Sequence, residues 1–130
     1  MGPFKAAVIQ AAAAGFDLER GLDKVARLAG EASVGGAALA VFPEAFLPAY
    51  PRGIAFGTVV GDRTAEGRDQ FRRYFDASVD VPGPAVDRLA AIAAENALHL
   101  VIGVVERDGG RCTARRCSSR PRGIWASTAS

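Results

Sequence analysis

The sequence is short of several residue types on which many active sites depend. Its 130 residues include two lysines (Lys5 and Lys24), one histidine (His99) and two cysteines, and both cysteines lie in the last twenty residues. A disulfide framework therefore has no basis in the first 110 residues. The segment "CTARRC" (112–117) has neither a second cysteine pair nor a nearby histidine, so we expect no zinc site.

Long hydrophobic runs are also missing. No apolar run approaches the roughly 20 residues of a membrane-spanning helix. The apolar stretch "MGPFKAAVIQAAAAG" (1–15) contains one lysine and alternates like a strand, which favours a strand over a signal peptide. We therefore expect a globular, cytoplasmic protein with one modest core and no attachment to a membrane.

The last twenty residues contain no acidic residue but five arginines, Arg111, Arg115, Arg116, Arg120 and Arg122. Without these arginines, 11 basic and 14 acidic residues remain, which is a net charge of −3. The first 110 residues are thus an acidic, alanine-rich, cysteine-free unit. Residues 111–130 form a tail of a different kind, which we expect to be unstructured.

Apolar patterning in residues 1–110 predicts strands that alternate with helices. An apolar stripe steps by three or four residues through 16–36, where Asp17 is the expected N-cap and Gly35-Gly36 end the helix. The predicted order is strand 4–12, helix 16–36, strand 37–42, a long loop, helix 65–78, a second helix after Pro82-Gly83-Pro84, and strand 100–107. This order indicates an α/β layered fold.

Glu44 lies just after the buried strand "AALAVF", between Pro43 and the prolines of "LPAYP". Sites in open α/β sheets form outside the carboxyl ends of strands, and desolvation at such an end would disfavour the charged carboxylate. That environment suits a general base. The alternative from the residues alone is that Glu44 caps the loop or pairs with Arg52. Glu106, at the end of strand 100–107, either faces the same site or is an ordinary strand-end charge. His99 is expected to be structural.

The segments "VFPEAFLPAYPRG", "FGTVVGDRTAEGRDQFRRYF", "VDVPGPAVDRLA" and "VIGVVERDGG" closely resemble the N-terminal part of nitrilases, in the carbon–nitrogen hydrolase superfamily. The resemblance runs from about residue 4 to residue 110. It implies the N-terminal portion of an α-β-β-α sandwich, truncated here, in a family whose members usually form homo-oligomers.

The resemblance also implies a reaction: hydrolysis of a small-molecule nitrile to a carboxylic acid and ammonia, without metal or cofactor. In the family's Glu-Lys-Cys mechanism a cysteine thiolate attacks the nitrile carbon, a glutamate acts as general base and a lysine stabilises the developing charge. Glu44 matches that glutamate. Tyr50 and Arg52 are candidates for shaping the substrate pocket or orienting Glu44.

The lysine and the cysteine of this mechanism are not found at matching positions. Lys5 and Lys24 stand in no family lysine motif, and Cys112 and Cys117 lie in an arginine-rich setting unlike that of the family nucleophile. We therefore expect this chain to be inactive and to fold poorly, because its sheet would lack a partner sheet and expose apolar surface.

A shift of reading frame would explain the tail. With GC-rich codons read from one base upstream, residues 111–121 become Thr-Leu-Tyr-Cys-Thr-Ala-Leu-Phe-Phe-Ala-Pro, and residues 125–130 become Leu-Gly-Lys-His-Arg-Lys. The recovered text alternates like a strand and then supplies a lysine motif. We hypothesise that residues 111–130 are read out of frame. The alternative function is a non-enzymatic α/β fragment whose basic tail binds polyanions. Within the hydrolase interpretation we expect no nucleic-acid partner.

Overall fold

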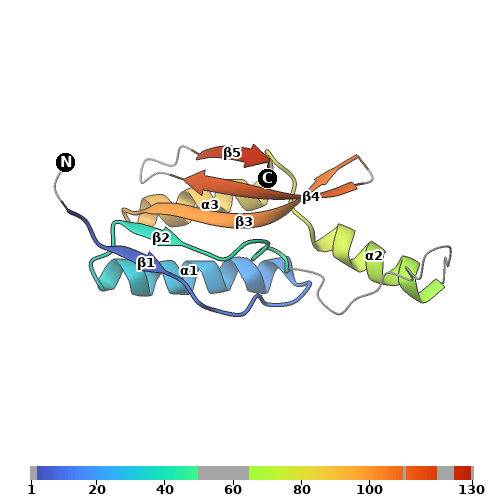
Figure 1. The fold of residues 1–130 in the computed structure, drawn as a ribbon, viewed down its shortest axis with the longest axis horizontal. Helices are drawn as coiled ribbons and strands as arrows, with labels where there is room; N and C mark the ends of the chain where they lie inside the picture. The colour runs from blue at the N-terminus through green and yellow to red at the C-terminus, as the bar shows by residue number, and fades with distance from the viewer. Residues whose placement is uncertain (1–2, 50–64, 110, 120–124, 130) are drawn as a thin grey trace.

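In the computed structural model, residues 3–49, 65–109, 111–119 and 125–129 are described. They form one five-stranded sheet with the order β1-β2-β3-β4-β5, and three helices (Figure 1). The strands are β1 (Ala6–Val8), β2 (Leu39–Val41), β3 (His99–Asp108), β4 (Arg111–Ser119) and β5 (Trp125–Ala129), and the helices are α1 (Leu18–Val34), α2 (Ala65–Ala77) and α3 (Pro84–Glu95). The α/β class and the order of the first six elements are as the sequence predicts.

The sheet changes direction at β3. Strands β1, β2 and β3 run parallel, as strand–helix–strand connections require, whereas β3, β4 and β5 are antiparallel neighbours. The sequence predicted no regular structure in the tail, and the structure differs on this point. The turn at Gly109, with φ +56°, returns the chain so that residues 111–119 pair along β3.

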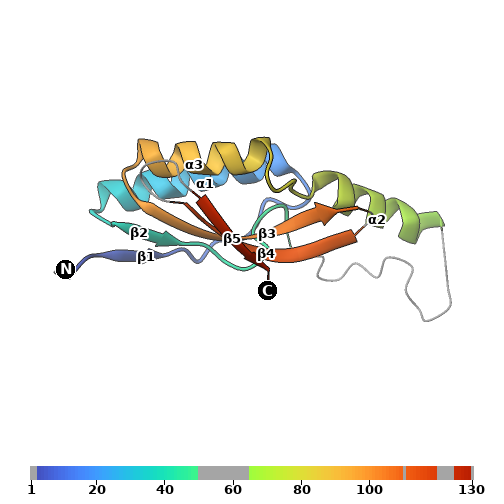
Figure 2. The same ribbon diagram turned by 90° about the horizontal axis from the view of Figure 1, so that it is seen from above.

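Helices α1 and α3 lie together on one face of the sheet (Figure 2). Asp17 caps α1, since its side chain accepts a hydrogen bond of 3.1 Å from the Arg20 amide, as predicted. The apolar stripe predicted in α1 points inward, and so do apolar residues of α3. From α1 and α3 they contribute Leu22, Val25, Ala29, Val86, Leu89 and Ala93 to a core completed by Ala40, Leu100, Ile102 and Cys117 from the sheet.

No helix of the described chain covers the opposite face of the sheet (Figure 2). The register places Val8, Val41 and Val101 side by side across β1, β2 and β3. Their neighbours Ala40 and Leu100 are fully buried under the helices, so strand alternation turns the three valines to the open face. Val8 is 72% exposed there. Among the described residues, no helix is both long and apolar enough to cross a membrane.

Candidate functional site at the end of β2

Glu44 stands three residues beyond the last residue of β2, in a loop that is fastened to β3. The Phe42 amide donates to the Val101 carbonyl at 2.8 Å, and the Gly103 amide donates to the Pro43 carbonyl at 3.2 Å. Further along the loop, the Leu47 amide donates to the Gly103 carbonyl at 3.3 Å, and the Leu47 carbonyl accepts from the Val105 amide at 2.7 Å. The chain on both sides of Glu44 is therefore held at the carboxyl ends of the parallel strands, as predicted.

Gly103 lies directly beneath Glu44. A Cβ atom added to Gly103 would lie 2.5 Å from the Ala45 nitrogen and 2.6 Å from the Glu44 Cα. Only glycine permits this approach, because real Cβ atoms do not come so close to backbone atoms. Ala45 itself has φ +49°, in the left-handed region. The signal in the sequence was a glycine inside an apolar strand, "VIGVV", which marks close approach of another backbone.

The Glu44 side chain is exposed, whereas the next residues, Ala45, Phe46 and Leu47, are buried. The sequence argument expected apolar surroundings to desolvate this carboxylate. Within the described part of the chain that expectation is wrong, because the apolar residues beside it pack toward the helices and the sheet rather than over the carboxylate. A desolvated Glu44 would require a further layer over the open face.

The other candidate residues do not gather around Glu44. Tyr50 and Arg52 lie outside the described residues. Glu106 is buried at 7% exposure. Because it is three residues from Gly103 along β3, strand alternation places it on the other face of the sheet from Glu44. His99 is exposed at the start of β3, where its backbone amide donates to the Ala38 carbonyl.

Both lysines and both cysteines are held elsewhere. The Lys5 ammonium donates to the Gly35 carbonyl at 2.9 Å and the Lys24 ammonium donates to the Ala12 carbonyl. Cys117, opposite Ile102, is buried in the core on the helix side. Cys112 is half-buried, with its sulfur 3.7 Å from the Ser78 hydroxyl. Among the described residues, neither a lysine nor a cysteine is therefore placed beside Glu44 to complete the expected Glu-Lys-Cys set.

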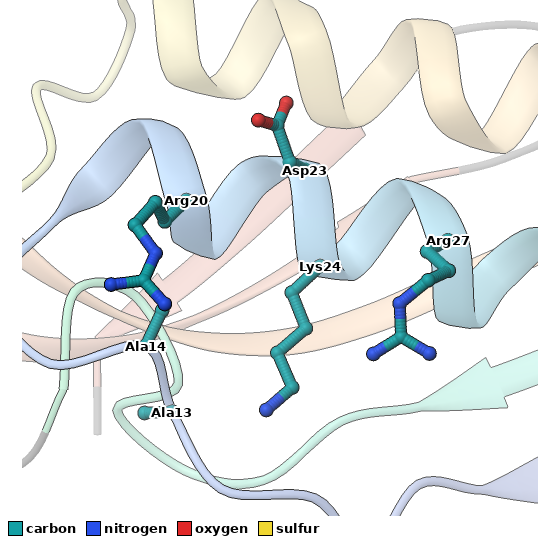
Figure 3. Close-up of a pocket in the computed structure, with 6 residues that line it drawn as sticks. All are labelled: Ala13, Ala14, Arg20, Asp23, Lys24 and Arg27. Atoms are coloured by element: carbon teal, nitrogen blue, oxygen red, sulfur yellow. The ribbon is translucent and has the colours of Figure 1, made fainter.

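Two hollows lie apart from Glu44. One, of about 630 Å³, is lined by Phe16–Glu19, Arg73, Asp76 and Ala77, between the start of α1 and the end of α2. The other is a groove of about 670 Å³ beside α1, lined by Ala13, Ala14, Arg20, Asp23, Lys24 and Arg27 (Figure 3). Among the described residues, no group of three or more His, Cys, Asp or Glu side chains could hold a metal ion.

A profile of the carbon–nitrogen hydrolase family matches residues 5–123. The chain belongs to the carbon–nitrogen hydrolase family. It is 52% identical over 105 residues to a bifunctional nitrilase/nitrile hydratase of Nicotiana tabacum, a match that covers 81% of this chain and 30% of that protein. It is also 50% identical over 115 residues to an arylacetonitrilase of Trametes versicolor, covering 85% of this chain and 35% of the relative.

Solved structures of carbon–nitrogen hydrolases share the fold. An amidase from Nesterenkonia sp. superposes with a TM-score of 0.66 at 25% identity, over 95% of this chain and 41% of the amidase. A superfamily protein from Xanthomonas campestris superposes with a TM-score of 0.71 at 19% identity, over 99% of this chain and 41% of that protein. The chain thus spans between 30% and 41% of the length of these relatives, and forms part of their sandwich.

Proposed function

We propose that this chain is the N-terminal part of a nitrilase-type hydrolase that converts a small-molecule nitrile to a carboxylic acid and ammonia, with Glu44 as its general base. One observation carries the proposal. In a chain half identical to nitrilases over its matched length, Glu44 is fixed at the carboxyl edge of the parallel strands by backbone hydrogen bonds on both sides. A base held in this way has a fixed position relative to a substrate at the same edge.

The chemistry requires two further groups. The proposal places the lysine in the motif that the upstream frame supplies at residues 125–130, and the cysteine in the part of the relatives' length that this chain does not span. Glu44 takes the proton of a cysteine thiol as its sulfur forms a bond to the nitrile carbon, and a lysine stabilises the charge that develops on the nitrogen. Glu44 passes that proton to the nitrogen, which completes a thioimidate and makes Glu44 a base again. Glu44 then deprotonates a water that adds to the thioimidate carbon. Both protons of this water end on the nitrogen as the C–N bond breaks, so ammonia leaves and a thioester remains. A second water hydrolyses the thioester to the acid and frees the thiol.

We further propose that residues 111–130 are read one base out of frame. The pairing of β3 with β4 places residue 117 opposite Ile102 and residue 119 opposite Leu100, both of which are buried against the helices. In the upstream frame, positions 117 and 119 become leucine and phenylalanine. Position 116, opposite Gly103 and so beside Glu44, becomes alanine in place of arginine. The residues encoded by the upstream frame therefore suit the position of β4 beside β3.

Sequencing the encoding DNA through the Gly109-Gly110 codons tests the frame. We expect the upstream frame to continue as an apolar strand followed by a lysine motif. If no upstream-shifted frame encodes them, the arginine-rich tail is the true sequence and the proposal of a shifted frame is wrong.

Ammonia release from aliphatic, aromatic and arylaceto-nitriles tests the function. We expect no release from the present 130-residue chain, and release from a protein in which the upstream frame is restored and continued. The substitution Glu44→Gln in the restored protein is expected to lower kcat by at least about 100-fold, because general-base catalysis is worth that much or more. Unchanged turnover in that variant would show that Glu44 is not the base.

Other properties follow from the same proposal. The homo-oligomeric state is inferred from the family, and the cytoplasmic location is the expectation drawn from the sequence. The alternative of a free basic arm that binds polyanions has less support, because residues 111–119 pair along β3 instead of extending from the domain.

A further inference from the structure

Three cations line up along the outer side of α1. Arg20, Lys24 and Arg27 occupy successive turns of the helix, and their side chains point in the same direction in Figure 3. With a rise of 1.5 Å per residue, their Cα atoms span about 10 Å along the helix axis. A single monovalent anion is too short for such a row, whereas an anion with several charged groups matches it.

The row of cations faces a second wall, formed by the segment that follows β1. Ala13 and Ala14 line this wall, and the Lys24 ammonium donates to the carbonyl of the adjacent Ala12, so the wall is tied to the helix. Alanine side chains leave the groove open, and its volume of about 670 Å³ is in the range of small-molecule sites. The groove is thus an open, shallow concave surface in which a ligand can contact both α1 and the segment after β1.

The acidic residues of α1 do not cancel this charge. Asp23 points away from the three cations in Figure 3, and it binds Arg88 of α3, which also binds Glu19 at 3.2 Å. The hydrogen bond that Arg88 donates to Asp23 raises the pKa of the Arg88 guanidinium above its ordinary value. Of the three cations, Arg27 pairs with a carboxylate, Glu31, at 3.2 Å.

We propose that this groove binds a small molecule that carries two or more phosphate groups. Two of its three cations are arginines, whose planar guanidinium groups bind phosphate oxygens in pairs, and a lysine stands between them as a compact charge. The shallow, alanine-lined wall offers an apolar ligand few contacts. The proposal does not depend on nitrile hydrolysis, because Glu44 does not line the groove.

The test is isothermal titration of the 130-residue chain with inorganic tripolyphosphate, inorganic monophosphate and ATP at 0.15 M salt, after circular dichroism has shown native helix content. We expect tripolyphosphate to bind at least about tenfold more tightly than monophosphate, because it can contact more than one cation. If ATP binds more tightly than tripolyphosphate, the ligand class is a nucleotide. If the two bind with equal affinity, the groove recognises the phosphate chain alone.

Substitutions distinguish phosphate binding in this groove from nonspecific attraction of an anion to a basic protein. The double substitution Arg20→Gln/Arg27→Gln and the single substitution Lys24→Gln should each weaken tripolyphosphate binding by about tenfold or more. Arg116→Gln, which removes an exposed cation from β4, is the matched control and should change binding less than about twofold. Absent binding of tripolyphosphate to the native chain, or an equal loss in the Arg116 variant, would overturn the proposal.

Discussion

At the scale of single residues, the position of Glu44 depends on the absence of a side chain on the next strand. Gly103 lets the backbone of residues 42–47 lie against β3, where four backbone hydrogen bonds hold it. Ala45 adopts its positive φ inside this arrangement. The catalytic candidate is therefore fixed by main-chain contacts rather than by ion pairs of its own carboxylate.

The substitution Gly103→Ala tests this arrangement. The new methyl group would lie 2.5 Å from the Ala45 nitrogen, and backbone atoms cannot move aside as a flexible side chain does. We expect the free energy of unfolding to fall by about 2 kcal/mol or more, as in other overpacked sites. Urea denaturation followed by circular dichroism measures it.

Gly30→Ala is the matched control for that experiment. Gly30 lies inside α1, and a Cβ there would be 3.7 Å from the nearest atom, an Asn96 oxygen. Alanine is the better helix former, so the control should raise the free energy of unfolding by about 0.5–1 kcal/mol. If both glycines tolerate alanine equally, the loop around Glu44 is not held against β3 as described.

At the scale of secondary-structure elements, α1 combines an N-cap residue, Asp17, with an apolar stripe that packs into the core. The substitution Asp17→Ala removes the oxygen that accepts from the Arg20 amide and should lower the free energy of unfolding by about 1 kcal/mol. Asp17→Asn keeps a capping oxygen and should recover most of that loss. Thermal denaturation of the two variants checks the difference, and equal losses would rule out capping as the cause.

The elements that the sequence could predict are those with a strong local pattern. The apolar spacing of α1 and α3, the capping by Asp17 and the position of Glu44 after β2 all follow from residues close together in the chain. Strands β4 and β5 could not be predicted from the sequence, because the arginine- and serine-rich tail has no apolar alternation. The pairing of β4 is set instead by the exposed edge of β3. The exposure of Glu44 depends on distant layers, which local patterns do not specify.

At the scale of the whole molecule, the described helices cover the sheet on one side only (Figure 2). The buried residues of β2 and β3 face α1 and α3, while Val8, Val41 and Val101 form a row on the open face. Sheets of this kind are normally packed on both faces or keep their outer face polar. An apolar row without a cover favours association with other apolar surfaces, including further copies of the same chain.

Val8→Lys tests whether this face limits the behaviour of the isolated chain. Val8 is 72% exposed, so the substitution removes little native packing while placing a charge at the β1 end of the valine row. We expect less self-association in analytical size-exclusion chromatography and less binding of a hydrophobic dye, without a fall in melting temperature.

The control is Val34→Lys, at the end of α1, where the side chain is 92% exposed and away from the sheet face. If the two lysine substitutions reduce self-association equally, the added charge alone explains the reduction. A wild-type chain that is already monomeric, with a cooperative melting transition, would show that the open face does not drive association.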